Sequence, residues 1–250
     1  MKIFAFLILF TAGFIGASSQ DVAALLKEAD RLEAVPNEIA AFNKFKEVLV
    51  VQPNNMHALT KCSELCSRIG SREKSSTNRD TYFAAALAYA NKAILVDPKS
   101  DKANVARAMA LGKSSMTKSG KEKIRSAKEI KKHLDVALAT NPSNYVAWHI
   151  LGRWNYELSN VSGVEKAAAK VFFGGVPQGS LKDAIMYFEK ARTLSPHFIL
   201  NNIELAKAYH KNNEDAKAIA LLKAVQAFPI STEDDAKHKA DALKLIKEYK

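Results

Sequence analysis

The sequence predicts an all-α protein, an α-solenoid built from stacked pairs of helices. Glycine and proline are scarce, at 10 and 7 of 250 residues, whereas the many turns of a β-sandwich or barrel consume these residues. Most of the prolines recur at one position of a repeated apolar pattern. The composition, 48% hydrophobic and 25% charged, excludes wholesale disorder, and the 2 cysteines exclude a disulfide scaffold.

The N-terminus has the pattern of a secretory signal. Lys2 precedes an almost unbroken apolar stretch that ends at Ala17 and falls short of the roughly 20 residues needed to span a bilayer. Ala17 and Ser19 are the small residues expected before a cut at Gln20. We predict a signal peptide over residues 1–19, export to the periplasm or medium, and no transmembrane segment after its removal. The alternative is an uncleaved membrane anchor with a cytosolic domain.

A repeated helix ending is the clearest regularity in the chain. The residues twelve, eight and five positions before a proline are small or apolar and share one helical face. Proline cannot continue a helix, so it marks each end. Four copies have this spacing: Ala41, Phe45 and Val48 before Pro53; Ala86, Ala90 and Ala93 before Pro98; Ile130, Leu134 and Ala137 before Pro142; and Ala184, Phe188 and Ala191 before Pro196. A fifth copy, one residue short, contains Ala218, Leu222 and Val225 before Pro229.

A second helix is expected after each proline. Small residues such as Gly152 and Ala206 lie where a paired helix must approach closely. A helix, a turn and a second helix with proline at the exit resemble the tetratricopeptide repeat, and the resemblance covers about residues 36–229. We therefore expect one tetratricopeptide-like domain over residues 20–250.

The first three repeats are longer than the usual period of about 34 residues. The surplus falls between the two helices of a repeat, at 70–80, 112–120 and 159–180. The first two segments are polar, which predicts solvated loops or frayed helix ends. The third, the insertion 159–180, predicts a short apolar helix that ends at Gly174 and folds back onto the solenoid, with Trp154 packed beneath it.

The region 144–196 also resembles the signature region of the regulator of microtubule dynamics family. The matching residues are Trp148, His149, Leu151, Gly152, Arg153, Trp154, Glu165, Lys166, Phe173, Gly174 and Pro177. The resemblance implies a tetratricopeptide-like fold and a microtubule- or tubulin-associated regulatory role. In that role the N-terminus would be an organelle or membrane anchor.

The last segment predicts a C-terminal capping helix. Ser231 and Thr232 precede two carboxylates, a pattern that satisfies the free amides at a helix start. The helix then runs to Lys250 with only a narrow apolar stripe. Terminal repeats need such a half-polar cap to stay soluble.

The first helix of each repeat is expected to line the concave side of the solenoid. Counted from the third residue after each proline, positions two, five, nine and twelve are expected to face outward into this groove. They include Thr60, Val105, His149 and Ile203 at position five. We predict that a peptide or an acidic protein segment binds there, since arginine recognises carboxylates in a bidentate manner. The predicted partner-binding residues are Lys102, His149, Arg153, Tyr156, Lys207 and His210. For each of them a solvated surface role is the alternative, and for His149 a packing role.

Positive charge is concentrated in one segment. The formal net charge is +11, and Lys113–Lys132 contains eight basic residues against Glu122 and Glu129. Such a segment predicts either a solvated helix face or attraction to an anionic surface. Few aromatic residues are interleaved, so nucleic-acid binding is not expected.

Catalytic motifs are absent from the sequence, which has no HExxH, GxSxG or GxGxxG pattern. The 6 histidines lack metal-ligand spacing, and Cys62 and Cys66, one helical turn apart, are expected to be core residues. We therefore predict a non-enzymatic protein–protein interaction scaffold that needs no cofactor and no metal. The alternative is the microtubule-associated regulator that the family resemblance implies.

Overall fold

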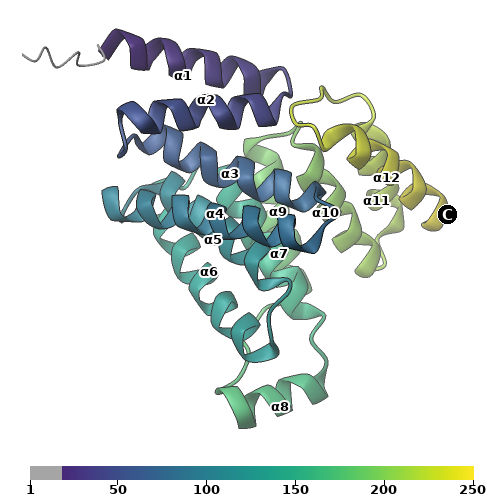
Figure 1. Cartoon of the computed structure of the whole chain (residues 1–250). Helices are drawn as coiled ribbons and strands as arrows, with labels where there is room; N and C mark the ends of the chain where they lie inside the picture. Colours follow the sequence, from purple (N-terminus) through teal and green to yellow (C-terminus); the bar gives the residue numbers. More distant parts are fainter. Residues whose placement is uncertain (1–18) are drawn as a thin grey trace, which may run out of the picture.

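The computed structural model describes residues 19–250, and every regular element in that range is a helix (Figure 1). The predicted signal peptide lies outside the described residues, except for Ser19, and stays a prediction. The elements are α1 (Ser19–Ala34), α2 (Glu38–Val51), α3 (Met56–Arg72), α4 (Ser76–Val96), α5 (Asp101–Ser115), α6 (Gly120–Thr140), α7 (Tyr145–Ser159), α8 (Gly163–Phe173), α9 (Leu181–Leu194), α10 (Ile199–Lys211), α11 (Asp215–Val225) and α12 (Asp235–Glu248).

The helices pack as consecutive pairs, which confirms the predicted solenoid. The pairs are α1 with α2, α3 with α4, α5 with α6, α7 with α9 and α10 with α11, and α12 covers α10 and α11 as the predicted cap. The apolar pattern did not reveal α1, which pairs with α2 before the first recognised repeat. In the described chain no helix is both long and apolar enough to cross a membrane.

The repeated apolar stripe forms the core. All of its predicted residues, from Ala41 in α2 to Val225 in α11, are buried, and only Ile130 is more than 0% exposed, at 8%. The helix ends also follow the prediction. The amide of Gln52, just before Pro53, still bonds to the carbonyl of Val48, but its backbone has left the helical region. Proline therefore ends the second helix of a repeat because its neighbour cannot remain helical.

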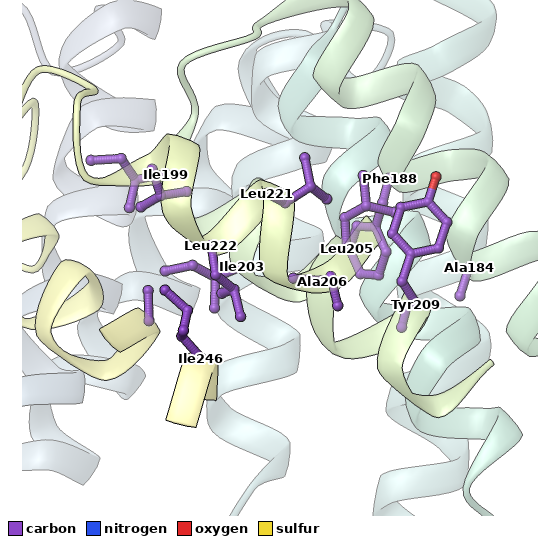
Figure 2. Close-up of a cluster of buried hydrophobic side chains, with 14 residues drawn as sticks. Ala184, Phe188, Ile199, Ile203, Leu205, Ala206, Tyr209, Leu221, Leu222 and Ile246 are labelled. Carbon is purple, nitrogen blue, oxygen red and sulfur yellow. The ribbon is translucent and has the colours of Figure 1, made fainter. Parts of the chain in front are cut away.

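The C-terminal core joins three repeat elements and the cap (Figure 2). Phe188 of α9, Leu205 of α10 and Leu222 of α11 are all fully buried, and Ile246 of α12 completes the cluster. Stacking of this kind buries an apolar face that a single helix pair would expose.

Gly152 confirms the expected close approach between paired helices. A Cβ atom placed there would lie 2.6 Å from Cδ1 of Phe188. Only glycine therefore lets α7 and α9 pack at this distance with the Phe188 ring between them.

The first two insertions are mostly helical. The surplus residues lengthen α3, α4 and α6, which have 17, 21 and 21 residues, and the connection between α3 and α4 shrinks to three residues. Of the predicted alternatives, loops hold only for 73–75 and for the exposed residues 116–119, and the remaining polar residues continue the helices. Such a residue keeps its backbone hydrogen bonds while its side chain remains in water.

The third insertion contains the predicted short helix, α8, which ends at Gly174 in the left-handed conformation, φ 71°. The expected fold-back is wrong, because α8 projects from the solenoid and its substantial contact with the described helices is with α6 (Figure 1). Trp154 bonds to α6 rather than to the insertion, since its indole N–H donates to the carbonyl of Ala127 at 2.8 Å.

Candidate functional site

The inner face of the solenoid is lined by α3, α5, α7 and α10, the first helices of successive repeats, which contact one another in that order. Position nine of each first helix is half-exposed on this face. The residues at this position are Glu64, Met109, Arg153 and Lys207. The face therefore changes from acidic at α3 to cationic at α7 and α10.

Ion pairs neutralise the α3 end of the inner face. Glu38 at the start of α2 is 1% exposed and lies 2.8 Å from Arg68 and 2.7 Å from Arg72. Glu33 of α1 pairs with Lys61 at 3.0 Å and with Arg68 at 2.8 Å. Each buried charge has an opposite charge next to it, which is the condition for burying it at tolerable cost.

The loop before α12 reaches this same end. The Glu233 carboxylate accepts a hydrogen bond from the amide of Glu38 at 2.7 Å, and Arg72 lies 3.1 Å from Glu233 and 3.2 Å from Asp234. We call these residues, Glu38, Arg68, Arg72, Glu233 and Asp234, the closing ion cluster. It connects the first repeats to the C-terminal cap, and Figure 1 shows the loop beside the start of α2.

The α7 and α10 end carries an excess of positive charge. Lys113 of α5, Arg153 of α7 and Lys207 of α10 form the cationic inner site together with one acid, Glu204 of α10. Lys207 pairs with Glu204 at 3.0 Å, and Arg153 reaches only Glu157, at 3.7 Å. Lys113 has no carboxylate within 4.0 Å among the described residues.

The pKa values of Lys113 and Glu204 reflect the neighbouring charges. Burial lowers the pKa of the Lys113 ammonium, and the charge of Arg153 lowers it further, against the opposing effect of Asp234 and Glu204. Burial tends to raise the pKa of Glu204, but the charges of Arg153 and Lys207 outweigh it and leave the pKa below its usual value. The site therefore contains a partly desolvated cation that lacks a close counter-charge, a condition that an incoming anion relieves.

The outward position expected for His149 is wrong. Its side chain is 4% exposed, its Nδ1 lies 3.1 Å from Oδ1 of Asn201, and its ring packs against Phe188 and Phe198. Position five is buried in every first helix, since Thr60, Val105 and Ile203 are at most 3% exposed. This position faces the neighbouring helices, so His149 has the packing role.

The other predicted residues differ in their positions. Lys102 is exposed at the start of α5, roughly 16 Å along the helix axis from Lys113. His210 bonds to Asp215 at 2.6 Å and stacks on Tyr249 with ring centroids 3.7 Å apart. Tyr156 is half-buried with Lys211 over its ring, and burial together with the Glu204 charge raises its pKa. Of the predicted set, the structure thus brings together Arg153, Tyr156 and Lys207 around Glu204.

Sequence reasoning missed Lys113 and Glu204 as members of the site. Lys113 was counted with the basic segment Lys113–Lys132, but it belongs to the last turn of α5, whereas Lys121–Lys132 lie on α6. The sequence contains one signal for Lys113. This residue directly follows position twelve of its helix, one of the positions expected to face the groove.

Metal and thiol chemistry find no support in the described part of the chain. It contains no cluster of three His, Cys, Asp or Glu side chains able to hold a metal ion. Cys62 and Cys66 are both buried and free, which confirms them as core residues. Burial raises the pKa of Cys66 to about 12, so its thiol is not a nucleophile at neutral pH.

The fold defines the class of protein, a tetratricopeptide-like helical solenoid. A thermophilic TPR protein from Thermus thermophilus superimposes on it with a TM-score of 0.65 at 16% sequence identity, over 89% of this chain and 99% of that one. At this identity the likeness concerns the fold alone.

The chain belongs to the regulator of microtubule dynamics family, because the family model described as Regulator of microtubule dynamics protein 1-3 matches residues 25–250. Regulator of microtubule dynamics protein 1 from Mus musculus is 31% identical over 163 residues, 64% of this chain and 53% of that protein. The Homo sapiens protein of the same name is 29% identical over 166 residues, 66% and 52% of the two chains. The chain thus spans about half the length of the curated relatives that it matches. The family resemblance of region 144–196 is confirmed.

Proposed function

We propose that the chain is a non-enzymatic protein-interaction scaffold that binds an acidic peptide segment at the cationic inner site. The observation that carries this proposal is Lys113, a partly buried ammonium beside Arg153 with no carboxylate within 4.0 Å in the described chain. A carboxylate from a partner supplies the missing counter-charge. The helical-repeat fold supports a binding role, since such solenoids present extended surfaces along successive repeats.

The position of the proposed site follows from the charge balance along the inner face. At α3 the cations Lys61, Arg68 and Arg72 are occupied by acids of this chain. At α5, α7 and α10, Glu204 pairs with Lys207 alone among the described residues. Lys113 and Arg153 have no buried carboxylate within 4.0 Å in that part of the chain. An extended acidic segment therefore gains most by lying across α7, where Arg153 offers a planar, two-pronged donor to a carboxylate.

The test uses short fluorescent peptides of equal length with negative, zero or positive net charge. We expect only the acidic peptides to raise the fluorescence anisotropy, and the double variant Lys113→Glu/Arg153→Glu to weaken their binding by about 10-fold or more, because loss of a close charge pair at an interface costs roughly 2 kcal/mol.

The matched control is Lys121→Glu/Lys128→Glu, which makes the same change in net charge on α6. We expect it to keep the wild-type affinity after a correction for ionic strength. Equal weakening by both double variants would mean that acidic peptides respond to net charge alone, and the proposed site would be wrong.

The relatives' names favour a second candidate function, the regulation of microtubule dynamics. This function requires that residues 1–19 are retained as an organelle or membrane anchor and that the helical domain lies in the cytosol. Co-sedimentation of the chain with assembled microtubules, together with cellular fractionation, tests it. We expect more of the chain than of a bovine serum albumin control to sediment with the microtubules. If it does not, the microtubule function is contradicted.

Export is the competing proposal for localisation, with residues 1–19 as a cleaved signal. Mass spectrometry of the mature chain is then expected to find Gln20 at or near the N-terminus. Retention of Met1 or Lys2 in the mature protein would contradict cleavage and favour the anchor.

A further inference from the structure

Helix α8 exposes three large apolar side chains. Val164 is 82% exposed, Val171 77% and Phe172 73%, whereas Ala169 on the other side of the helix is 7% exposed. Val164, Ala168, Val171 and Phe172 follow a spacing of four, three and one residues, which places them on one helical face. We call this set the α8 face. A surface helix of a soluble domain normally has the opposite arrangement, with its apolar stripe toward the core.

The position of α8 leaves this face available. The helix lies between α7 and α9 in sequence, yet it projects beyond the solenoid next to α6, its substantial contact among the described helices (Figure 1). Both ends of α8 are well defined. A capping box of Ser162 and Glu165 starts the helix, and Gly174 ends it. The apolar face is therefore held by a formed helix rather than by a frayed segment.

Positive charge accompanies the α8 face. Lys166 and Lys170 are exposed on the opposite, polar side of α8. The segment 118–128, at the start of α6, contains five cations and one acid, and that acid, Glu122, is occupied by the Ser119 hydroxyl at 2.9 Å. The exposed side of α6 carries a cavity of about 420 Å³, lined by Lys121, Glu122, Ile124, Arg125 and Lys128.

We propose that the α8 face and the adjoining cations of α6 dock on an anionic phospholipid bilayer. Apolar side chains of an amphipathic helix enter the boundary between headgroups and acyl chains, and nearby lysine and arginine residues are attracted by anionic headgroups. A second copy of the chain fits less well, because pairing two α8 faces would bring the two cationic segments together. This docking surface is separate from the cationic inner site and does not depend on the proposed function.

The experiment reads the local environment of the α8 face in the full chain. Val171→Cys carries an environment-sensitive NBD label, which is selective because Cys62 and Cys66 are buried. The positional control is Val50→Cys on α2, where the native valine is 82% exposed, close to the 77% of Val171. We expect vesicles of phosphatidylcholine and phosphatidylglycerol to brighten the label and shift its emission to shorter wavelength at position 171 and not at 50. Vesicles of phosphatidylcholine alone are expected to have little effect.

Two charge-reversed backgrounds test the contribution of α6. In Lys121→Glu/Lys128→Glu we expect the lipid concentration at half-maximal response to rise by about 30-fold, the equivalent of about 1 kcal/mol for each of two cations. Lys113→Glu/Arg153→Glu, which changes the net charge equally, is expected to keep the wild-type response.

Three results would overturn the proposal. These are no response at position 171, an equal response at positions 50 and 171, and an equal response to the two vesicle types. Sedimentation velocity tests whether a second copy of the chain binds the α8 face instead. Self-association that Val171→Asp abolishes, together with a label that does not respond to vesicles, would assign the face to a second copy.

Discussion

Arg72 in α3 and Asp234 in the loop before α12 form an ion pair of 3.2 Å although 162 residues separate them in the chain. The pair belongs to the closing ion cluster, which ties the first repeats to the C-terminal cap. A solenoid of neighbouring contacts alone has no such link. The cluster therefore makes the stability of the cap depend on the first repeats.

Replacing Arg72 tests this dependence. In Arg72→Gln the buried Glu38 loses one of its two cations, and Glu233 and Asp234 lose theirs. We expect the free energy of unfolding to fall by about 1–3 kcal/mol and hydrogen exchange to speed up in α12, measured by urea denaturation and mass spectrometry. The control Arg31→Gln breaks an exposed pair with Glu28 and is expected to leave the stability nearly unchanged, because water screens such a pair. Unchanged exchange in α12 would show that the cluster does not hold the cap.

Gly152 tests the packing of α7 on α9. In Gly152→Ala the new Cβ atom meets the Phe188 ring at 2.6 Å, and overpacking of this kind costs about 1–3 kcal/mol. Gly163→Ala, the first residue of α8, is the control, since its Cβ atom meets nothing within 4 Å. In thermal denaturation we expect Gly152→Ala to have a clearly lower melting temperature than Gly163→Ala. Equal melting temperatures would contradict the close approach.

His149 gives the chain a pH dependence. Burial lowers its pKa to about 4 from an ordinary value of 6.5, and the Asn201 amide, which donates to the carbonyl of Phe188, presents its oxygen to the imidazole N–H. As the pH falls below 6.5 the unfolded chain takes up the proton while the folded chain does not, so the free energy of unfolding decreases until about pH 4. We expect a loss of about 2 kcal/mol from this residue between pH 7 and pH 5. Urea denaturation at both pH values is expected to show that His149→Asn loses less free energy of unfolding between pH 7 and pH 5 than the wild type does. Equal losses in the two proteins would contradict a buried neutral histidine.

The two cysteines test the core of the first repeats. Both Cys62 and Cys66 are 0% exposed, and burial raises the pKa of each thiol. We expect DTNB to react with neither thiol in the folded chain and with both in denaturant. Rapid reaction in native buffer would mean that α3 opens far more readily than its packing indicates.

Local patterns predicted the core because each apolar stripe lies within a single helix. The stripe from Ala184 to Ala191, for example, needs only the 3.6-residue period and the following proline to be recognised. The same counting failed at position five, where His149 and Ile203 are buried, since the direction that a first helix presents depends on how tightly the next repeat stacks. Helix α1 has no such stripe before a proline and was not predicted.

Long-range relationships could not be predicted from these patterns. The contact between Arg72 and Asp234 depends on the rotation accumulated over successive repeats, which the sequence does not state. The same reason applies to Lys113, whose neighbours Arg153 and Glu204 come from two other repeats. In α8 the sequence showed an apolar helix, and the fold-back was expected because exposed Phe172 is costly in water; the structure instead places Phe172 outward.

Carbodiimide cross-linking locates an acidic segment that is bound at the cationic inner site. The reagent joins a lysine amine to a carboxylate that touches it, and the lowered pKa of Lys113 favours its reaction. With an acidic peptide bound, mass spectrometry is predicted to find the peptide attached to Lys113 or Lys207, and Arg153→Glu is predicted to remove these products. Attachment confined to the α6 lysines, Lys121 to Lys132, would show that the acidic segment does not bind at the cationic inner site.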